Sequence, residues 1–335
     1  MGEDGDPDVD GNQRMLLRAI GTGPRGTTVI VARILTSTAF PNLPTTTVSN
    51  PALLINGDLY MHGNNKILGA EGNVHANGDL TKDGASGEVS GDVTATGTID
   101  ANDNFDVGGV MSGGMPAINV PDIKAADYLG LADWILTETG SMVQAASGIT
   151  CGGKGPTCPS GWTFSGGTWS ASGSMPTSAT YYVKGDVTMK GVGKSTLTGL
   201  SLIAEGSITL SGNSQFKPEN SSQIQFVANG DLVMGVDADA EAINVDGQIL
   251  VREQLKIHGN ATFQGRVIAQ SVDGDDNVWN ASTNPNGRRG TNILDTNELD
   301  GTITVTYEGT LGDIVSEIPG GPDSYVNNIL GWIEQ

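Results

Sequence analysis

Five aspartates could supply the carboxylates of a sugar-cleaving site, and all five follow a glycine in a repeated phrase. They are Asp58, Asp79, Asp92, Asp186 and Asp231. Hydrolysis of a glycosidic bond with inversion needs two carboxyl groups held several ångströms apart across that bond. Aspartate is also the residue expected in a tight turn. Because the same residue returns in the same phrase, we interpret these aspartates as corner residues and expect the protein not to be an enzyme.

The three histidines, His62, His75 and His258, are the other side chains that could bind a metal or transfer a proton. They lie far apart in the sequence. His62 and His258 each precede Gly-Asn at a predicted turn. We therefore expect these rings to stack at corners of the fold rather than to bind a metal ion.

Calcium is the one cofactor that the sequence suggests. Asp6-Pro7-Asp8-Val9-Asp10-Gly11 matches the opening of a calcium loop, but the twelfth position, which needs a bidentate glutamate, is Leu17. An EF-hand is therefore excluded. The acidic segment of Asp4, Asp6, Asp8 and Asp10 could hold calcium only with ligands from elsewhere, and a flexible acidic end is the alternative.

The two cysteines, Cys151 and Cys158, enclose a short segment rich in glycine that also contains a proline. A disulfide would fit this loop and would imply an oxidising compartment; two free thiols are the alternative. Trp162 and Trp169 follow in a Gly/Ser-rich stretch. They could contact a sugar if exposed, or form a small core under the cysteine loop together with Phe164.

The elements that must position these residues are predicted by the spacing of the glycine phrase. In Gly57-Asp58-Leu59-Tyr60-Met61 the apolar residues lie two apart, so both point to one side of a strand. We expect the preceding glycine and aspartate to form a turn that tolerates positive φ. Gly57 and Gly78 are 21 residues apart, as are Gly185 and Gly206. A period near 20 with a turn and strand on each side predicts a parallel β-solenoid, expected as a right-handed β-helix. An antiparallel β-sandwich is the alternative.

Composition agrees with a mainly β protein and narrows its partners. The chain of 335 residues contains 49 glycines and has a net charge of −21. Such an acidic chain repels nucleic acid and anionic lipid, so we expect neither as a partner. The sequence has no apolar stretch of the length of a transmembrane helix and does not open with an export signal. We therefore expect a piece of an extracellular or cell-surface protein that lacks its export and anchoring helix.

The phrases divide the chain into five predicted regions. The first is an acidic tail, a β-hairpin and a linker, and the last is a C-terminal loop with a β segment. Two solenoid blocks lie between them, separated by an insertion with a helix from Pro121 to Gly140 and the cysteine loop. The ranges are 1–50, 51–112, 113–180, 181–273 and 274–335.

Four segments together resemble a known family. They are Arg18–Gly23, Gly57–Ile99 with the phrases GNVHANGDL and SGDVTATG, Asp127–Leu136, and the tail Gly331-Trp332-Ile333-Glu334. The chain is similar to the large pilin-like proteins of the PilX type, associated with bacterial type IV pili, that carry a β-solenoid domain. This resemblance implies an exported, surface-displayed segment with a role in pilus assembly or adhesion. It implies other pilus subunits or surface glycans as partners, and no catalytic residues.

Two other functions fit the same pattern. The first is a secreted β-helix that binds or cleaves polysaccharide, because pectin lyases and polygalacturonases share that fold, although a fold alone does not establish a function. The second is another surface solenoid, such as a phage tail-spike or a scaffold.

Overall fold

The computed structural model describes residues 14–22, 28–36, 51–192, 198–219, 223–235, 243–272, 296–309, 328–329 and 333–334. They belong to two units, which are described separately. The terminal unit contains Met1–Val48 and Val315–Gln335, so both ends of the chain contribute to it. The solenoid contains Ser49–Ile314.

The terminal unit is built on the predicted hairpin. Strand β1 (Arg14–Thr22) pairs antiparallel with β2 (Thr28–Thr36) along its full length, which confirms the hairpin. Two short C-terminal strands, β29 (Asn328–Ile329) and β30 (Ile333–Glu334), pair antiparallel with β2. The two chain ends are therefore held in one small sheet.

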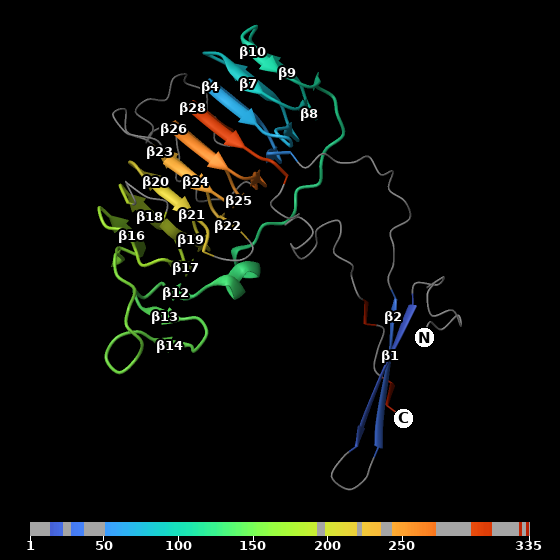
Figure 1. The fold of residues 1–335 in the computed structure, drawn as a ribbon, viewed down its shortest axis with the longest axis vertical. Coiled ribbons are helices and arrows are strands. Elements are labelled where there is room, and N and C mark those ends of the chain that lie inside the picture. Colours follow the sequence, from blue (N-terminus) through green and yellow to red (C-terminus); the bar gives the residue numbers. More distant parts are fainter. Residues whose placement is uncertain are drawn as a thin grey trace. The chain divides into compact units, whose positions relative to one another are not determined.

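The solenoid has three rows of parallel strands, and the coils are stacked along each row (Figure 1). In stacking order, row 1 contains β12 (Trp134–Leu136), β17 (Ala179–Val183), β19 (Thr198–Ala204), β22 (Ile224–Ala228), β25 (Gln248–Val251), β27 (Val267–Ala269), β3 (Leu53–Ile55), β5 (Val74–Ala76), β8 (Val93–Ala95) and β11 (Met111–Ser112). Row 2 contains β16 (Thr168–Ser172), β18 (Val187–Lys190), β20 (Ile208–Ser211), β23 (Leu232–Gly235), β26 (Leu255–Gln264), β28 (Asn297–Thr306), β4 (Leu59–Leu68), β6 (Leu80–Asp83) and β9 (Ile99–Ala101). Row 3 contains β21 (Gln215–Lys217), β24 (Ile243–Asp246), the second halves of β26, β28 and β4, then β7 (Gly87–Val89) and β10 (Phe105–Val107). The predicted parallel β-solenoid is confirmed.

Three long strands, β26, β28 and β4, serve both row 2 and row 3. Each passes from one row to the next at a glycine in positive φ: Gly259, Gly301 and Gly63. A Cβ atom on Gly63 would lie 2.5 Å from the carbonyl oxygen of Gly301. Glycine is therefore required at this corner both for its φ and for the close approach of neighbouring coils.

The order of the coils differs from the order of the chain. Strand β27 of the second predicted block pairs with β3 of the first, and β28 lies between β26 and β4. Figure 1 shows this as neighbouring strands of contrasting colour, with β28 beside β4. The two predicted blocks therefore form one continuous stack, in which the second block precedes the first. Residues 297–306, predicted as part of a separate C-terminal region, belong to the solenoid.

A connector, residues 113–133, runs back along the solenoid from its last coil to its first (Figure 1). Asn77 Oδ1 accepts a bond from the Ile118 N–H, Gln270 Oε1 from Ile123, and Asn229 Oδ1 from Ala125, at 2.8, 3.0 and 2.7 Å. The connector includes the helix η1 (Ala125–Leu131), which is a 3-10 helix that buries Ala125 and Tyr128.

The predicted helical insertion is present but shorter than the Pro121–Gly140 range. Trp134 and Ile135 fall within that predicted range and continue its apolar helical spacing, yet they lie in β12, which pairs with β17 and with β13. Pairing with two neighbouring strands overrides the helical periodicity because it satisfies the backbone and buries Leu136 at the same time.

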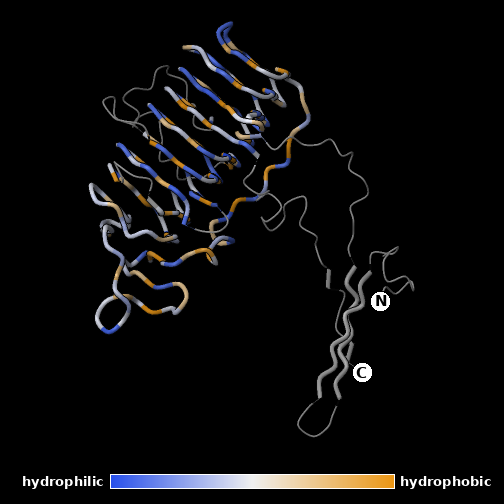
Figure 2. Tube along the Cα trace, in the orientation of Figure 1, coloured by the Kyte–Doolittle hydropathy of each residue, from blue (hydrophilic) through white to orange (hydrophobic). Residues whose placement is uncertain are grey.

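The interior is filled by apolar side chains, many of which alternate along their strands. Figure 2 shows that hydrophobic residues recur along the coils. Fully buried examples are Leu59, Met61, Val187 and Met189. Burying each such side chain stabilises the fold by about 1.5–3 kcal/mol. Row 1 also buries side chains on its other face, among them Leu54, Ile203 and Leu250.

The chain enters and leaves the solenoid at one corner. The Ala52 carbonyl accepts a bond from the Val267 N–H at 2.8 Å, and the Thr306 carbonyl accepts one from the Gly265 N–H at 2.9 Å. Val267 and Gly265 lie two positions apart in the sequence, so the first and the last parts of the described solenoid chain meet at the same place. The solenoid is an insertion between the two halves of the terminal unit.

Candidate functional site

The aspartates of the glycine phrase bind the backbone of the next coil. The Oδ1 atoms of Asp58, Asp79, Asp92 and Asp186 accept from the N–H groups of Asp79, Thr98, Val110 and Ser207, at 2.8, 2.6, 2.8 and 2.8 Å. Asp231 Oδ1 likewise accepts from the Gln254 N–H at 3.1 Å. The geometry agrees with the prediction that they are corner residues. Each carboxylate therefore holds two neighbouring coils together.

Two glycines of the phrase are needed for a different reason from the one predicted, whereas Gly185 has the predicted positive φ, at 118°. Gly78 and Gly206 are not among the glycines in positive φ. A Cβ atom on Gly78 would lie 2.2 Å from Asp58 Oδ1, and one on Gly206 would lie 2.2 Å from Asp186 Oδ1. The phrase therefore couples neighbouring coils, because the carboxylate of one coil occupies the space that a side chain on the next would need.

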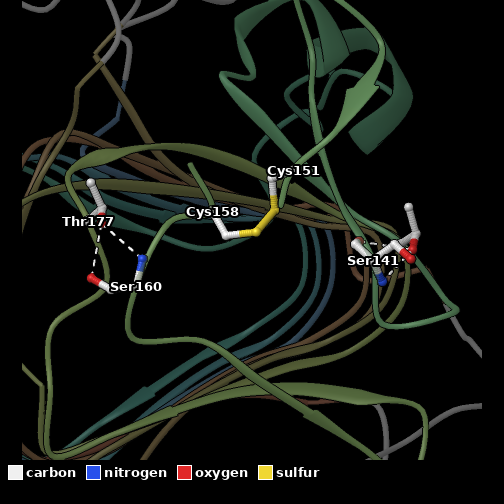
Figure 3. Close-up of a disulfide and its surroundings, with 6 residues drawn as sticks. Ser141, Cys151, Cys158, Ser160 and Thr177 are labelled. Atoms are coloured by element: carbon white, nitrogen blue, oxygen red, sulfur yellow. Dashed lines mark hydrogen bonds between the residues drawn. A yellow bond between two sulfur atoms is a disulfide. The ribbon is translucent and has the colours of Figure 1, made fainter. Parts of the chain in front are cut away.

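The disulfide between Cys151 and Cys158 is present, with Cα atoms 5.0 Å apart. Figure 3 shows it beside the segment in which the Ser160 N–H and Thr177 Oγ1 form a hydrogen bond of 3.1 Å. Its loop follows β13 (Met142–Gln144) and β14 (Ile149–Thr150), which extend β12 in an antiparallel sheet. The acidic calcium candidates, Asp4, Asp6, Asp8 and Asp10, lie outside the described residues.

Trp162 and Trp169 are buried, which removes the physical basis for sugar stacking. Their exposed fractions are 8% and 2%. Trp169 Nε1 donates to the Thr137 carbonyl at 2.8 Å, and Trp162 packs edge-on against Tyr181. Strand β15 (Thr163–Ser165) pairs with β16 and brings Phe164 against Trp169. These residues therefore form a small aromatic core, as in the alternative interpretation of the sequence. This aromatic core fills the solenoid interior at its first end.

A column of alternating histidines and aspartates crosses four successive coils, at β26, β28, β4 and β6. The register places His258 of β26 beside Asp300 of β28, Asp300 beside His62 of β4, and His62 beside Asp83 of β6. Neighbouring parallel strands lie about 4.8 Å apart, so these side chains are within reach of one another. We call this set the His–Asp column.

The His–Asp column is divided into two clusters. In the first, His258 lies 3.7 Å from Glu298 (Nε2 to Oε2) and 3.6 Å from Asp300 (Nδ1 to Oδ2). In the second, His62 Nδ1 contacts Asp83, and the Tyr60 hydroxyl donates to the same carboxylate at 2.9 Å. The side chains of both clusters are partly exposed, between 17% and 40%. Among the described residues, the first cluster brings together three possible metal ligands, His258, Glu298 and Asp300, with one ligand atom of each within 4.8 Å of the others.

His75 stands apart from the column and is buried. Its Nδ1 is bonded to Thr94 Oγ1 at 2.8 Å and its Nε2 to Asn77 Oδ1 at 2.9 Å. Burial lowers the pKa of this imidazole below its usual value, and the bond to Asn77 opposes that effect. Asn77 also accepts from the Ile118 N–H, so His75 helps to position the connector.

In the copy of the phrase that begins at Gly78, Lys82 takes the place of the second apolar residue; it pairs in register with Met61 and is buried. Its ammonium donates to the carbonyls of Gly63, Asp83 and Ala85 at 2.9, 2.8 and 2.8 Å. Desolvation lowers the pKa of this lysine. These three carbonyl acceptors compensate the cost of burying the charge. Lys82 therefore stabilises the turn at Gly84.

The sequence singled out the histidines, but as corner residues rather than metal ligands, and gave no expectation for Glu298, Asp300, Tyr60 or Asp83. A signal was present: His62-Gly63-Asn64, His258-Gly259-Asn260 and Asp300-Gly301-Thr302 share a polar residue before a glycine and another after it. These are the corners of the three long strands. Aligning the three glycines puts Asp300 at the same place as the two histidines, but only the strand pairing puts it between them.

Comparisons with protein-family models, with curated proteins and with solved structures found no match to this chain. In the part of the chain that the structure describes, no helix has the length and apolar character needed to cross a membrane.

Proposed function

We propose that this protein is a non-catalytic structural or adhesive protein of the bacterial cell surface that works in association with type IV pili. The observation that carries the proposal is the insertion of the solenoid between two halves of a unit that contains both chain ends. Such an insertion presents a rigid body through two connections. The link to pili rests on the sequence resemblance, and pilus subunits or surface glycans are the proposed partners.

Two features support a structural role. The repeated aspartates are engaged with backbone N–H groups of the next coil, as Asp58 is with Asp79, and so serve the stack itself. The Cys151–Cys158 disulfide agrees with an oxidising compartment, where such bonds persist. A surface location and the absence of catalysis both follow from the proposal and await its test.

The test uses cells that make the native protein and an antibody against the solenoid. Surface appendages are sheared from normal cells and from cells that cannot assemble pili, and both fractions are blotted. We expect the solenoid in the sheared fraction of normal cells and its loss from that fraction without pili. Its presence in both sheared fractions would favour another surface solenoid, and its restriction to the cytosol would overturn surface display.

Polysaccharide binding or cleavage is the alternative, and it has a separate test. The purified protein is applied to a glycan array and to polysaccharides with a reducing-sugar assay. Glycan binding with no products agrees with an adhesive role. Release of products that is lost in the Asp58→Asn or Asp186→Asn variants would overturn the non-catalytic proposal.

A further inference from the structure

One imidazole and two carboxylates are brought together where β28, the last described strand of the solenoid in chain order, enters the stack. One ligand atom from each of His258, Glu298 and Asp300 lies within 4.8 Å of the other two. His258 comes from β26, whereas both acids come from β28, about 40 residues later in the chain. The group therefore exists only when β28 is paired in place.

Backbone geometry fixes these three side chains on one face. Glu298 and Asp300 are two apart on a strand, so they point to the same side. His258 is the register partner of Asp300, one strand spacing away. Both strands run for ten residues. Ligands on paired strands are held more firmly than ligands on loops.

The distances suit a transition-metal ion with modest side-chain rotation. Bonds of about 2.0–2.1 Å to nitrogen and oxygen in a tetrahedral site place ligand atoms roughly 3.4 Å apart. The imidazole nitrogens are 3.7 Å from Glu298 and 3.6 Å from Asp300. A single nitrogen must serve the metal, so rotation of the ring and of one carboxylate completes the geometry.

The ligand set favours zinc over calcium. Imidazole with carboxylate is typical of zinc and related ions, whereas calcium takes six to eight oxygen atoms. His258 and Glu298 are 18% and 17% exposed and Asp300 is 40% exposed, so one side stays open to water. The net charge of −21 also attracts cations to the molecule.

We propose that His258, Glu298 and Asp300 bind one zinc ion, and that this ion fastens β28 to β26. The ion stabilises the insertion of the strand that joins the two predicted blocks. This proposal is independent of surface display or pilus association. It assigns the zinc a structural role, because the ion would connect two segments that are distant in the sequence.

The second cluster of the His–Asp column is a matched control within the same protein. His62 and Asp83 also form a histidine–carboxylate pair between neighbouring coils. The register partner of Glu298 on β4 is Tyr60. A phenol in place of the second carboxylate removes a strong zinc ligand, so the His62 cluster should bind zinc far more weakly.

The test measures zinc binding to the purified full chain, freed of any affinity tag and stripped with chelator. The variants are His258→Gln, Glu298→Gln and Asp300→Asn, with His62→Gln as control, and circular dichroism checks that each folds. We expect one tight zinc per chain, with Kd about 1 µM or below, in the wild type and in His62→Gln. Each of the three ligand variants should weaken binding at least about tenfold, and zinc should raise the melting temperature only where it binds.

Two further measurements do not depend on variants. Cobalt in place of zinc should give the intense visible absorption of a tetrahedral site, and millimolar calcium should not displace it. The proposal is overturned if the wild type shows no saturable zinc binding. It is also overturned if His258→Gln and Glu298→Gln bind as the wild type does, if His62→Gln loses binding equally, or if calcium displaces the ion.

Discussion

The two ends of the solenoid are finished in different ways. At the first end, β12 is extended by the antiparallel strands β13 and β14, a disulfide closes the following loop, and Trp169 fills the interior. At the last end, the described strands β9, β10 and β11 pair only with β6, β7 and β8. Val110, Met111 and Met115 are 63%, 49% and 39% exposed there.

The two ends show two ways in which a solenoid can prevent further strands from pairing with its terminal coil. A capped end covers the last coil with structure of another kind, which repeat proteins need for solubility. The open end relies on strands of two or three residues and on exposed acids, including Asp100 and Asp106. Short edge strands and charges are known devices against edge-to-edge pairing. We therefore expect the first end to be stable and the last end to open readily.

The largest expected effect is the removal of the aromatic core at the capped end. Trp169→Ala should lower the free energy of unfolding by about 3–5 kcal/mol, because a fully packed indole and its bond to Thr137 are lost. Phe105→Ala at the open end, where the ring is only half-buried, should cost about 1–2 kcal/mol. Urea unfolding followed by fluorescence and circular dichroism measures both. Equal costs would contradict the contrast between the ends.

Loss of the disulfide should come next and should remain local. The bond closes a loop with a sequence separation of 7, for which the chain-entropy model gives about 2.5 kcal/mol. In Cys151→Ser/Cys158→Ser, we expect faster hydrogen exchange in β12–β14 and unchanged exchange in β9–β11. A reducing agent should reproduce this effect in the wild type and leave the double variant unaffected. Faster exchange at both ends would show that the cap stabilises the whole stack.

Glycine substitutions should cost more inside the stack than at its open end. An alanine at Gly206 or Gly109 would place a Cβ atom 2.2 Å from Asp186 or 2.1 Å from Asp92. The last coil can shift outward, whereas coils stack on both sides of Gly206. We expect Gly206→Ala to cost about 2 kcal/mol and Gly109→Ala less than about 1 kcal/mol in denaturant unfolding. A larger cost at Gly109 would show that the open end is rigid.

The smallest expected effect is a pH dependence carried by His75, in the coils nearer the open end. Burial lowers the pKa of the folded imidazole from its usual 6.5, so the unfolded chain binds a proton first as the pH falls. Stability from this group is fully present above about pH 6.5 and is lost on acidification below it. Melting between about pH 7.5 and 5 should show a smaller decline in His75→Gln than in the wild type. Identical pH profiles would exclude His75 as a source of acid sensitivity.

The coil could be predicted from the sequence because its determinants are local. Leu59 and Met61 point inward because they alternate, and Gly78 and Asp58 mark a corner because the same pair recurs at the coil period. The Cys151–Cys158 disulfide could likewise be predicted from the spacing of the two cysteines. The predicted helix is too long because the spacing of apolar residues at Trp134 and Ile135 also fits a helix. Only pairing with β17 makes this segment a strand.

The candidate site could not be predicted in the same way. Glu298 and Asp300 resemble the other acidic residues of the sequence. They form a candidate site only because the strand pairing places them beside His258. The aromatic residues Trp162 and Trp169 fit either an exposed or a buried setting in a Gly/Ser-rich stretch. Burial against Tyr181 and Thr137, which the sequence does not reveal, decides between the two settings.

The sequence by itself thus determined the repeating unit, its period and the residues at its corners, because alternation and close approach act within one coil and its neighbour. The tertiary structure alone decided the order in which the coils stack. A parallel strand pairs equally well with any coil of matching register, so the second block can precede the first and β28 can enter between them. The connector that runs back from β11 to β12 permits that order, and the order places His258 beside the acids of β28.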